Sequence, residues 1–194
     1  MTVTVSKLIW LALGGIWIIL RWNPERRARK TPIRSSSRDS WEICLLTISL
    51  TGLGIIPVVY IAIHFPRFAD YAFFPVQGYF GIGTYVAALW LFYCTHRDLK
   101  RNWSLSLELR EHHMLVTTGS YAYVRHPMYA SFWLMAFAQL LMLPNFIVGL
   151  AGLLGFGSLF FGRVRREEEM MIGAFGDEYR AYMRRTSRLV PWMY

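Results

Sequence analysis

Two side chains of opposite charge follow the last apolar stretch of this 194-residue chain. Arg163 and Glu167 stand four residues apart in "RVRREEE", residues 163–169. If the last apolar helix continues through this stretch, both side chains share one face, because residues four apart are neighbours on an α-helix. An arginine there offers a planar fork that suits a carboxylate. Spacing alone favours an interfacial helix whose arginines reach lipid headgroups, and leaves a binding site as the alternative.

A second polar stretch, "EHHMLVTTGSYAYVRHPMY" at residues 111–129, lies between two strongly apolar regions. His126 and Pro127 predict the start of a helix, since proline is tolerated in a first turn. The N–H groups of that turn and the positive end of the helix dipole suit a carboxylate. Gly119 predicts a turn with positive φ inside an extended loop. A tyrosine-rich loop at the membrane edge is the ordinary interpretation of such a stretch.

The histidines and cysteines do not form a metal-binding pattern. His112, His113 and His126 lack the His-Glu-x-x-His spacing that puts two ligands on one helical face. Cys44 and Cys94 form no Cys-x-x-Cys pair, and we expect both to be small apolar side chains within membrane spans. No metal is therefore predicted.

Two Gly-x-Gly pairs, at residues 81–83 and 155–157, lie inside apolar segments. A dinucleotide-binding fingerprint needs a strand before it and a helix after it, and neither is predicted here. We expect these glycines to let transmembrane helices approach each other closely.

The composition indicates a membrane protein. Hydrophobic residues make up 55% of the chain and charged residues 17%, against about 45–50% and about 25% in typical soluble domains. The formal net charge of +9 would suggest nucleic acid if the cations formed a patch on a soluble fold. They stand instead at the ends of apolar segments, so no nucleic-acid partner is predicted.

Several segments are apolar and close to the length of about 20 residues that a helix needs to cross a bilayer. They are residues 3–20, 41–65, 71–93, 128–143 and 146–162. Only Pro144 and Asn145 separate the last two, which predicts a tight helical hairpin. We therefore predict one all-α integral membrane domain, residues 1–194, with five transmembrane helices. The first segment is expected to be retained, because no cleavage pattern follows it.

The basic residues predict the orientation of these spans. Nearly all of the 21 lysines and arginines lie in residues 21–40, in residues 95–127 and in the tail from residue 163. Under the positive-inside rule these three regions are cytoplasmic, so the N-terminus lies outside and the C-terminus inside. Residues 21–40 are expected only to set this topology and to meet anionic headgroups.

Both polar stretches resemble the isoprenylcysteine carboxyl methyltransferase family, within a wider group of membrane methyltransferases that includes phospholipid N-methyltransferases. The shared pattern is a histidine, a small apolar pair, Gly, Tyr and Arg-His-Pro-x-Tyr, then Arg-x-x-x-Glu-Glu and Phe-Gly-x-x-Tyr. This chain has "HMLVTTGSYAYVRHPMY", then "RVRREEE", then "FGDEY". The resemblance covers roughly the last 85 residues, and its motifs are more specific to the superfamily than to a substrate.

The resemblance implies a pocket for S-adenosylmethionine on the cytoplasmic side, formed within about residues 105–194 by the last spans and the tail, without a Rossmann domain. Carried over by motif position, the residues that line this pocket are His113, Met114, Leu115, Val116, Tyr121, His126, Pro127, Met128 and Tyr129. The resemblance also places Glu167 against the cofactor and Arg163 against the substrate carboxylate, as the catalytic pair. Glu168 is left as a supporting residue. Glu169 exceeds the motif, so which of the three glutamates is essential stays open.

The implied activity is methylation of the C-terminal carboxylate of a prenylated cysteine, or of another lipid-linked carboxylate, with the lipid chain entering from the membrane. An amine acceptor would make the chain a phospholipid N-methyltransferase, which is the main alternative. Membrane sterol reductases share part of the C-terminal motif and bind NADPH, but their usual larger set of spans is absent from the sequence. A non-catalytic membrane scaffold would bind no S-adenosylmethionine.

Overall fold

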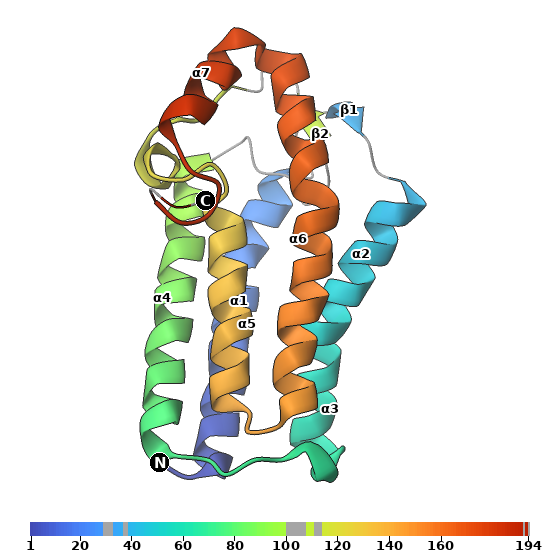
Figure 1. Ribbon diagram of the computed structural model, residues 1–194, viewed down its shortest axis with the longest axis vertical. Coiled ribbons are helices and arrows are strands. Elements are labelled where there is room, and N and C mark those ends of the chain that lie inside the picture. Colours follow the sequence, from blue (N-terminus) through green and yellow to red (C-terminus); the bar gives the residue numbers. More distant parts are fainter. Residues whose placement is uncertain (29–32, 37–38, 100–107, 111–113, 192, 194) are drawn as a thin grey trace.

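The computed structural model describes residues 1–28, 33–36, 39–99, 108–110, 114–191 and 193, which form a bundle of upright helices (Figure 1). The helices are α1 (Val3–Ala28), α2 (Ser40–Leu50), α3 (Ile56–Ile63), α4 (Pro75–Leu99), α5 (Pro127–Met142), α6 (Phe146–Phe175) and α7 (Asp177–Arg185). Shorter turns are the π-helical η1 (Thr51–Ile55) and the 3-10 turns η2 (Arg67–Ala69) and η4 (Gly119–Ala122). The all-α class is confirmed. It is accompanied by a small antiparallel pair, β1 (Ile33–Ser36) with β2 (Glu108–Arg110), which the sequence had not predicted.

Three helical stretches of the described chain are long and apolar enough to cross a membrane. They are Val3–Trp22, Ser40–Ile63 and Phe146–Phe175. The helix α5 is apolar but shorter, and α4 is long but is not among the three. Large apolar side chains nevertheless face outward from α4, including Phe80 and Trp90. Several apolar helices are therefore present, while the crossing of the membrane by all five predicted spans stays a prediction.

The helical hairpin predicted at Pro144 and Asn145 is confirmed. The helix α5 ends at Met142 and α6 begins at Phe146, and the side chain of Asn145 accepts a hydrogen bond from the N–H of Val148 at 3.1 Å. The structure also shows that α6 continues well past the predicted span end at residue 162, as far as Phe175. Gly176, with a φ of 54°, then ends the helix. One continuous helix therefore runs from the hairpin tip to the charged stretch.

The hairpin occupies the middle of the bundle (Figure 1). Its first helix packs against α4, α1 and α6, and α6 packs along α2 and η1. Buried side chains form two clusters between these helices. Phe92 and Met142 belong to the cluster between α1, α4 and α5. Phe156 and Phe160 belong to the cluster between α2, α5 and α6.

Close helix packing is confirmed for three of the four predicted glycines, among them Gly157, where a Cβ atom would lie 3.2 Å from the Trp133 ring. A Cβ atom on Gly155 would lie 3.0 Å from the carbonyl oxygen of Ile48, and one on Gly81 would lie 2.6 Å from the side chain of Met142. Gly52, in η1, meets α6 even more closely, because a Cβ there would overlap the carbonyl oxygen of Ala151. Small residues are what allow two backbones to touch in this way. By contrast, Gly83 has open space around it.

Replacement of Gly52 by alanine should lower the free energy of unfolding by about 1–3 kcal/mol, because the new methyl group would overlap the backbone of α6. The matched control is Gly83→Ala, where no atom lies within 4 Å of the added carbon. Alanine there should be neutral or slightly stabilising, since it favours a helix more than glycine does. Thermal unfolding of both variants in detergent measures the difference. Equal unfolding temperatures would show that the Gly52 crossing is looser than the structure indicates.

Candidate functional site

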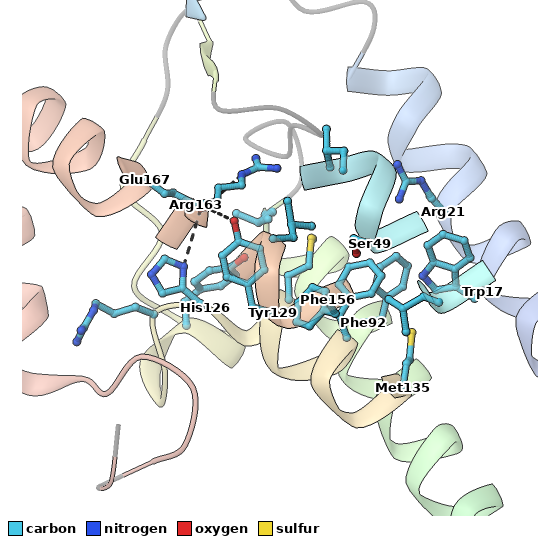
Figure 2. Close-up of a pocket in the computed structure, with 18 of the residues that line it drawn as sticks. Trp17, Arg21, Ser49, Phe92, His126, Tyr129, Met135, Phe156, Arg163 and Glu167 are labelled. Carbon is cyan, nitrogen blue, oxygen red and sulfur yellow. Dashed lines mark hydrogen bonds and ion pairs between the residues drawn. The ribbon is translucent and has the colours of Figure 1, made fainter. Parts of the chain in front are cut away.

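A cavity of about 650 Å³ opens between the hairpin and the helices around it. Figure 2 shows its two ends: His126, Tyr129, Arg163 and Glu167 lie on one side, and mainly apolar side chains such as Trp17 and Phe92 lie on the other, together with Arg21 and Ser49. Side chains from α1, α2, α4, α5, α6 and α7 all contribute to the lining. The cavity therefore depends on segments that lie far apart in the sequence.

Most of the residues predicted for the cofactor and the substrate line this one cavity. They are Met114, Leu115, Val116, Tyr121, His126, Met128, Tyr129, Arg163 and Glu167. Pro127 is buried and occupies the first position of α5, but it does not line the cavity. His113 lies outside the described residues. The two polar stretches of the sequence are therefore brought together, although their roles toward a ligand stay predictions.

Arg163 and Glu167 share one face of α6, as their spacing indicates. The Nε atom of Arg163 lies 4.0 Å from Oε2 of Glu167, and the Arg163 side chain is 9% exposed. A second carboxylate approaches from α2, where Oε1 of the buried Glu42 lies 3.4 Å from Nη1 of Arg163. A buried ion needs such partners, because its removal from water is costly. The two glutamates hold the guanidinium at the cavity wall.

Glu167 also joins α6 to the start of α5. The hydroxyl of Tyr129 donates a hydrogen bond of 2.5 Å to Oε2 of Glu167. The Nδ1 atom of His126 lies 3.9 Å from the other carboxylate oxygen, and its ring stacks on that of Tyr129 with the centroids 5.4 Å apart. The Arg-His-Pro-x-Tyr motif and the Arg-x-x-x-Glu motif are therefore in direct contact at the polar end.

The loop before α5 is held in place by Asp98 from the end of α4. Gly119 has the predicted positive φ, 66°, and a side chain there would overlap the carboxylate of Asp98. That carboxylate accepts hydrogen bonds from the N–H and the hydroxyl of Ser120, at 2.7 and 2.9 Å. The loop itself differs from the predicted extended form, because Gly119–Ala122 make a 3-10 turn. This turn directs Tyr121 into the cavity wall.

Tyrosines from the tail complete the polar end. Tyr179 and Tyr182 of α7 both line the cavity. The Tyr182 hydroxyl donates a 2.6 Å hydrogen bond to the carbonyl oxygen of Tyr121. Burial raises the pKa of Tyr182 to about 12 and that of Tyr121 well above its usual value. Both phenols are therefore neutral hydrogen-bond donors at physiological pH.

The other end of the cavity is mainly apolar and lies between the helices of the bundle, with Arg21 and Ser49 also in its lining. Its lining includes Trp17 from α1, Phe92 from α4, Phe132 and Met135 from α5, and Phe156 and Leu159 from α6. The rings pack on one another, with the centroids of Phe132 and Phe156 5.3 Å apart. Such a surface suits a hydrocarbon chain.

The three glutamates, among which the sequence could not choose the essential one, occupy different positions in the structure. Glu167 lines the cavity. Glu168 is 3% exposed and lies behind the cavity, where it pairs with Arg125 and Arg188. Glu169 is 67% exposed and pairs with Arg165 on the surface. Among the described residues, no group of three His, Cys, Asp or Glu side chains is arranged to hold a metal ion.

Sequence reasoning missed Glu42, Arg125 and the aromatic residues of the apolar end. Glu42 had one visible signal, because it is the single acid at the head of the apolar segment 41–65. Arg125 belongs to the Arg-His-Pro motif but was assigned no role. The aromatic lining had no signal, since apolar side chains inside predicted spans look alike whether they face lipid or a cavity.

Residues 81–173, which contain α5 and most of α4 and α6, match the family model described as the isoprenylcysteine carboxyl methyltransferase family. The predicted family resemblance is confirmed. The residues matched include Arg163, Glu167 and the sequence between α4 and α5, and the match stops before α7 and the tail.

Several methyltransferases of other organisms align with a little under half of this chain. The protein-S-isoprenylcysteine O-methyltransferase of Schizosaccharomyces pombe is 38% identical over 79 residues, 41% of this chain and 34% of the relative. The human protein of that name is 35% identical over 86 residues, 44% of this chain and 30% of the relative. Methanethiol S-methyltransferase 1 of Bradyrhizobium diazoefficiens is 38% identical over 72 residues, 37% of this chain and 24% of the relative. The aligned stretch thus spans about a third or less of these relatives.

Proposed function

We propose that this chain transfers a methyl group from S-adenosylmethionine to the C-terminal carboxylate of a prenylated cysteine. The observation that carries the proposal is the position of Arg163 and Glu167, which face a single cavity that is polar beside them and apolar farther in. A carboxylate joined to a hydrocarbon chain needs both environments at once. The names of the relatives support the same reaction.

The residues at the polar end fit the methyl donor. S-adenosylmethionine carries a sulfonium and an ammonium group, and Glu167 offers a carboxylate to such cations. The aromatic rings of Tyr121, Tyr129 and Tyr179 belong to the same wall, and aromatic faces attract cations. The donor's own carboxylate suits the first turn of α5, which begins at the cavity. The cavity of about 650 Å³ falls within the usual range of small-molecule sites, about 300–1,000 Å³.

When bound, S-adenosylmethionine supplies an electrophilic methyl group, and the methyl–sulfur bond breaks with its electron pair left on sulfur as the bond to the carboxylate oxygen forms. Arg163 holds the carboxylate, because its guanidinium offers parallel donors to two oxygens. Glu167 keeps Arg163 and Tyr129 in position through the contacts at 4.0 and 2.5 Å. No general base is needed, since a C-terminal carboxyl group with a pKa of about 3.5 is ionised at neutral pH. The chain therefore contributes mainly alignment and a site poor in water.

The proposal includes a membrane topology. The five predicted spans would correspond to α1, the continuous stretch α2–η1–α3, α4, α5 and the first part of α6. With the basic segments on the cytoplasmic side, the polar end of the cavity lies at the cytoplasmic membrane surface. A soluble cofactor then reaches it from the cytoplasm, and the lipid chain of the acceptor enters the apolar end from the bilayer. Membrane lipids are the surrounding partners.

The acceptor is the point on which the alternatives differ. One aligned relative is named for a thiol acceptor and others for the carboxyl group of a prenylated cysteine, so the shared stretch is compatible with more than one nucleophile. A phospholipid amine is the further alternative from the sequence, and the names of these relatives do not favour it. A reductase or a scaffold would transfer no methyl group.

We expect the purified chain in detergent to form a base-labile methyl ester from methyl-labelled S-adenosylmethionine and N-acetyl-S-farnesylcysteine. The rate should stay nearly flat between pH 6 and pH 8.5, because the acceptor carboxylate, with a pKa of about 3.5, is ionised throughout that range. A thiol or amine acceptor should instead give a rate that rises about tenfold per pH unit below its own pKa. Heat-treated protein is the control. The absence of labelled ester above this control would contradict the proposal.

A further inference from the structure

A cluster of charged side chains lies directly behind the polar end of the cavity and centres on Glu168. This buried carboxylate accepts hydrogen bonds from Nε of Arg125 at 2.9 Å and from Nη2 of Arg188 at 2.7 Å. The Nε atom of Arg188 also donates to both carboxylate oxygens, at 3.2 and 3.0 Å. A carboxylate that is 3% exposed requires such partners, because an unpaired buried charge is strongly destabilising.

The tail segment 186–188 brings Arg188 to this cluster by running beside the residues that precede α5. The N–H of Arg125 donates to the carbonyl oxygen of Ser187 at 2.8 Å, and the N–H of His126 donates to that of Arg188 at 3.0 Å. Val124 and Ser187 form a parallel bridge. Figure 1 shows the tail returning from α7 to the start of α5. The tail thus fixes the backbone from which two cavity-lining side chains project.

His126 connects this cluster to the cavity. Its Nε2 atom lies 3.4 Å from Oε1 of Glu168, and its Nδ1 atom lies 3.9 Å from Oε1 of Glu167. One edge of the ring therefore faces the buried cluster, and the other faces the glutamate of the cavity wall. A shift of Glu168 would move the ring, and with it the stacked ring of Tyr129.

We propose that Arg188 is a positioning residue for the methyl-donor site and acts through Glu168 on His126. The tail segment 186–188 closes against the start of α5, and the double contact of Arg188 with Glu168 keeps His126 and Arg125 at the cavity wall. This inference rests on the proposed function in one respect, which is the assignment of the polar end to the methyl donor. Arg188 lies beyond the family match, which ends at residue 173. Its role therefore follows from the contacts of this chain.

Replacement of Arg188 by alanine should weaken the binding of S-adenosylhomocysteine about tenfold, because Glu168 would lose its two-atom contact and release His126. Arg188→Lys should recover part of the affinity, since lysine keeps the charge but not the fork. Arg180→Ala is the matched control, because Arg180 pairs with Asp177 on the surface of α7. Calorimetry in detergent measures all four proteins. The maximal rate with saturating cofactor should change much less than the affinity.

A second measurement separates this inference from the proposed function. In protein labelled at histidine, the ring resonance of His126, assigned by its loss in His126→Gln, should shift in Arg188→Ala and stay unchanged in Arg180→Ala. An unchanged resonance would overturn the positioning role whether or not a cofactor binds. If the wild-type protein binds no S-adenosylhomocysteine but the His126 resonance still shifts in Arg188→Ala, the proposed donor is refuted and the positioning of His126 by Arg188 is retained. Lower thermal stability with unchanged affinity and resonance would show that Arg188 is only structural.

Discussion

Arg163→Lys should lower the rate of methyl-ester formation about a hundredfold and leave the affinity for S-adenosylmethionine within about twofold. The side chain of Arg163 is nearly buried between Glu42 and Glu167, and it lines the cavity where an acceptor carboxylate would lie. A lysine keeps the positive charge that Glu42 requires, so the fold should survive. It cannot keep the planar pair of donors that fixes both oxygens of a carboxylate.

One control variant and two measurements make the Arg163 result interpretable. Arg165→Lys is the matched control, because Arg165 stands on the same helix with its side chain 86% exposed and pairs with Glu169 on the surface. Its turnover should equal that of the wild type. Steady-state rates at saturating cofactor and calorimetric affinities give the two numbers needed. If Arg163→Lys turns over at the wild-type rate, Arg163 does not hold the acceptor.

Glu167→Gln should weaken the binding of S-adenosylmethionine at least tenfold. The carboxylate is the acid that faces the cavity beside Arg163, and it accepts the 2.5 Å hydrogen bond from Tyr129. An amide of the same shape can still accept that bond, but it offers no negative charge to a sulfonium or an ammonium group. The loss should therefore appear mainly in affinity for the positively charged donor.

A ligand without the sulfonium charge shows whether the negative charge of Glu167 matters for binding. S-adenosylhomocysteine lacks the positive charge on sulfur, so its affinity should fall less than that of S-adenosylmethionine in Glu167→Gln. Glu169→Gln removes a charge two residues away that is 67% exposed, and both affinities should stay unchanged there. Calorimetry in detergent measures the affinity of each protein for each ligand. Equal affinities of wild type and Glu167→Gln for S-adenosylmethionine would remove Glu167 from the donor site.

Local features of the sequence determined a large part of this molecule. The apolar segments predicted the helices, the pair Pro144 and Asn145 predicted the hairpin, and Gly119 predicted a turn. The spacing of Arg163 and Glu167 placed them on one face, because helical geometry is set by neighbours three and four residues away. The motifs that contain them also predicted the family resemblance, over roughly the last 85 residues, and the family model matches residues 81–173.

Contacts between distant segments were decided only by the tertiary structure. Glu42 meets Arg163 because α2 packs along α6, and nothing near Glu42 in the sequence indicates that partner. Glu168 and Arg188 meet because the tail turns back after Gly176 and pairs with the residues before α5. The sequence also did not predict which aromatic side chains line the apolar end of the cavity. In a chain with 55% hydrophobic residues, composition does not tell a side chain that faces lipid from one that faces a cavity. That distinction depends on which helices pack together, and the packing depends on shape complementarity over the whole bundle.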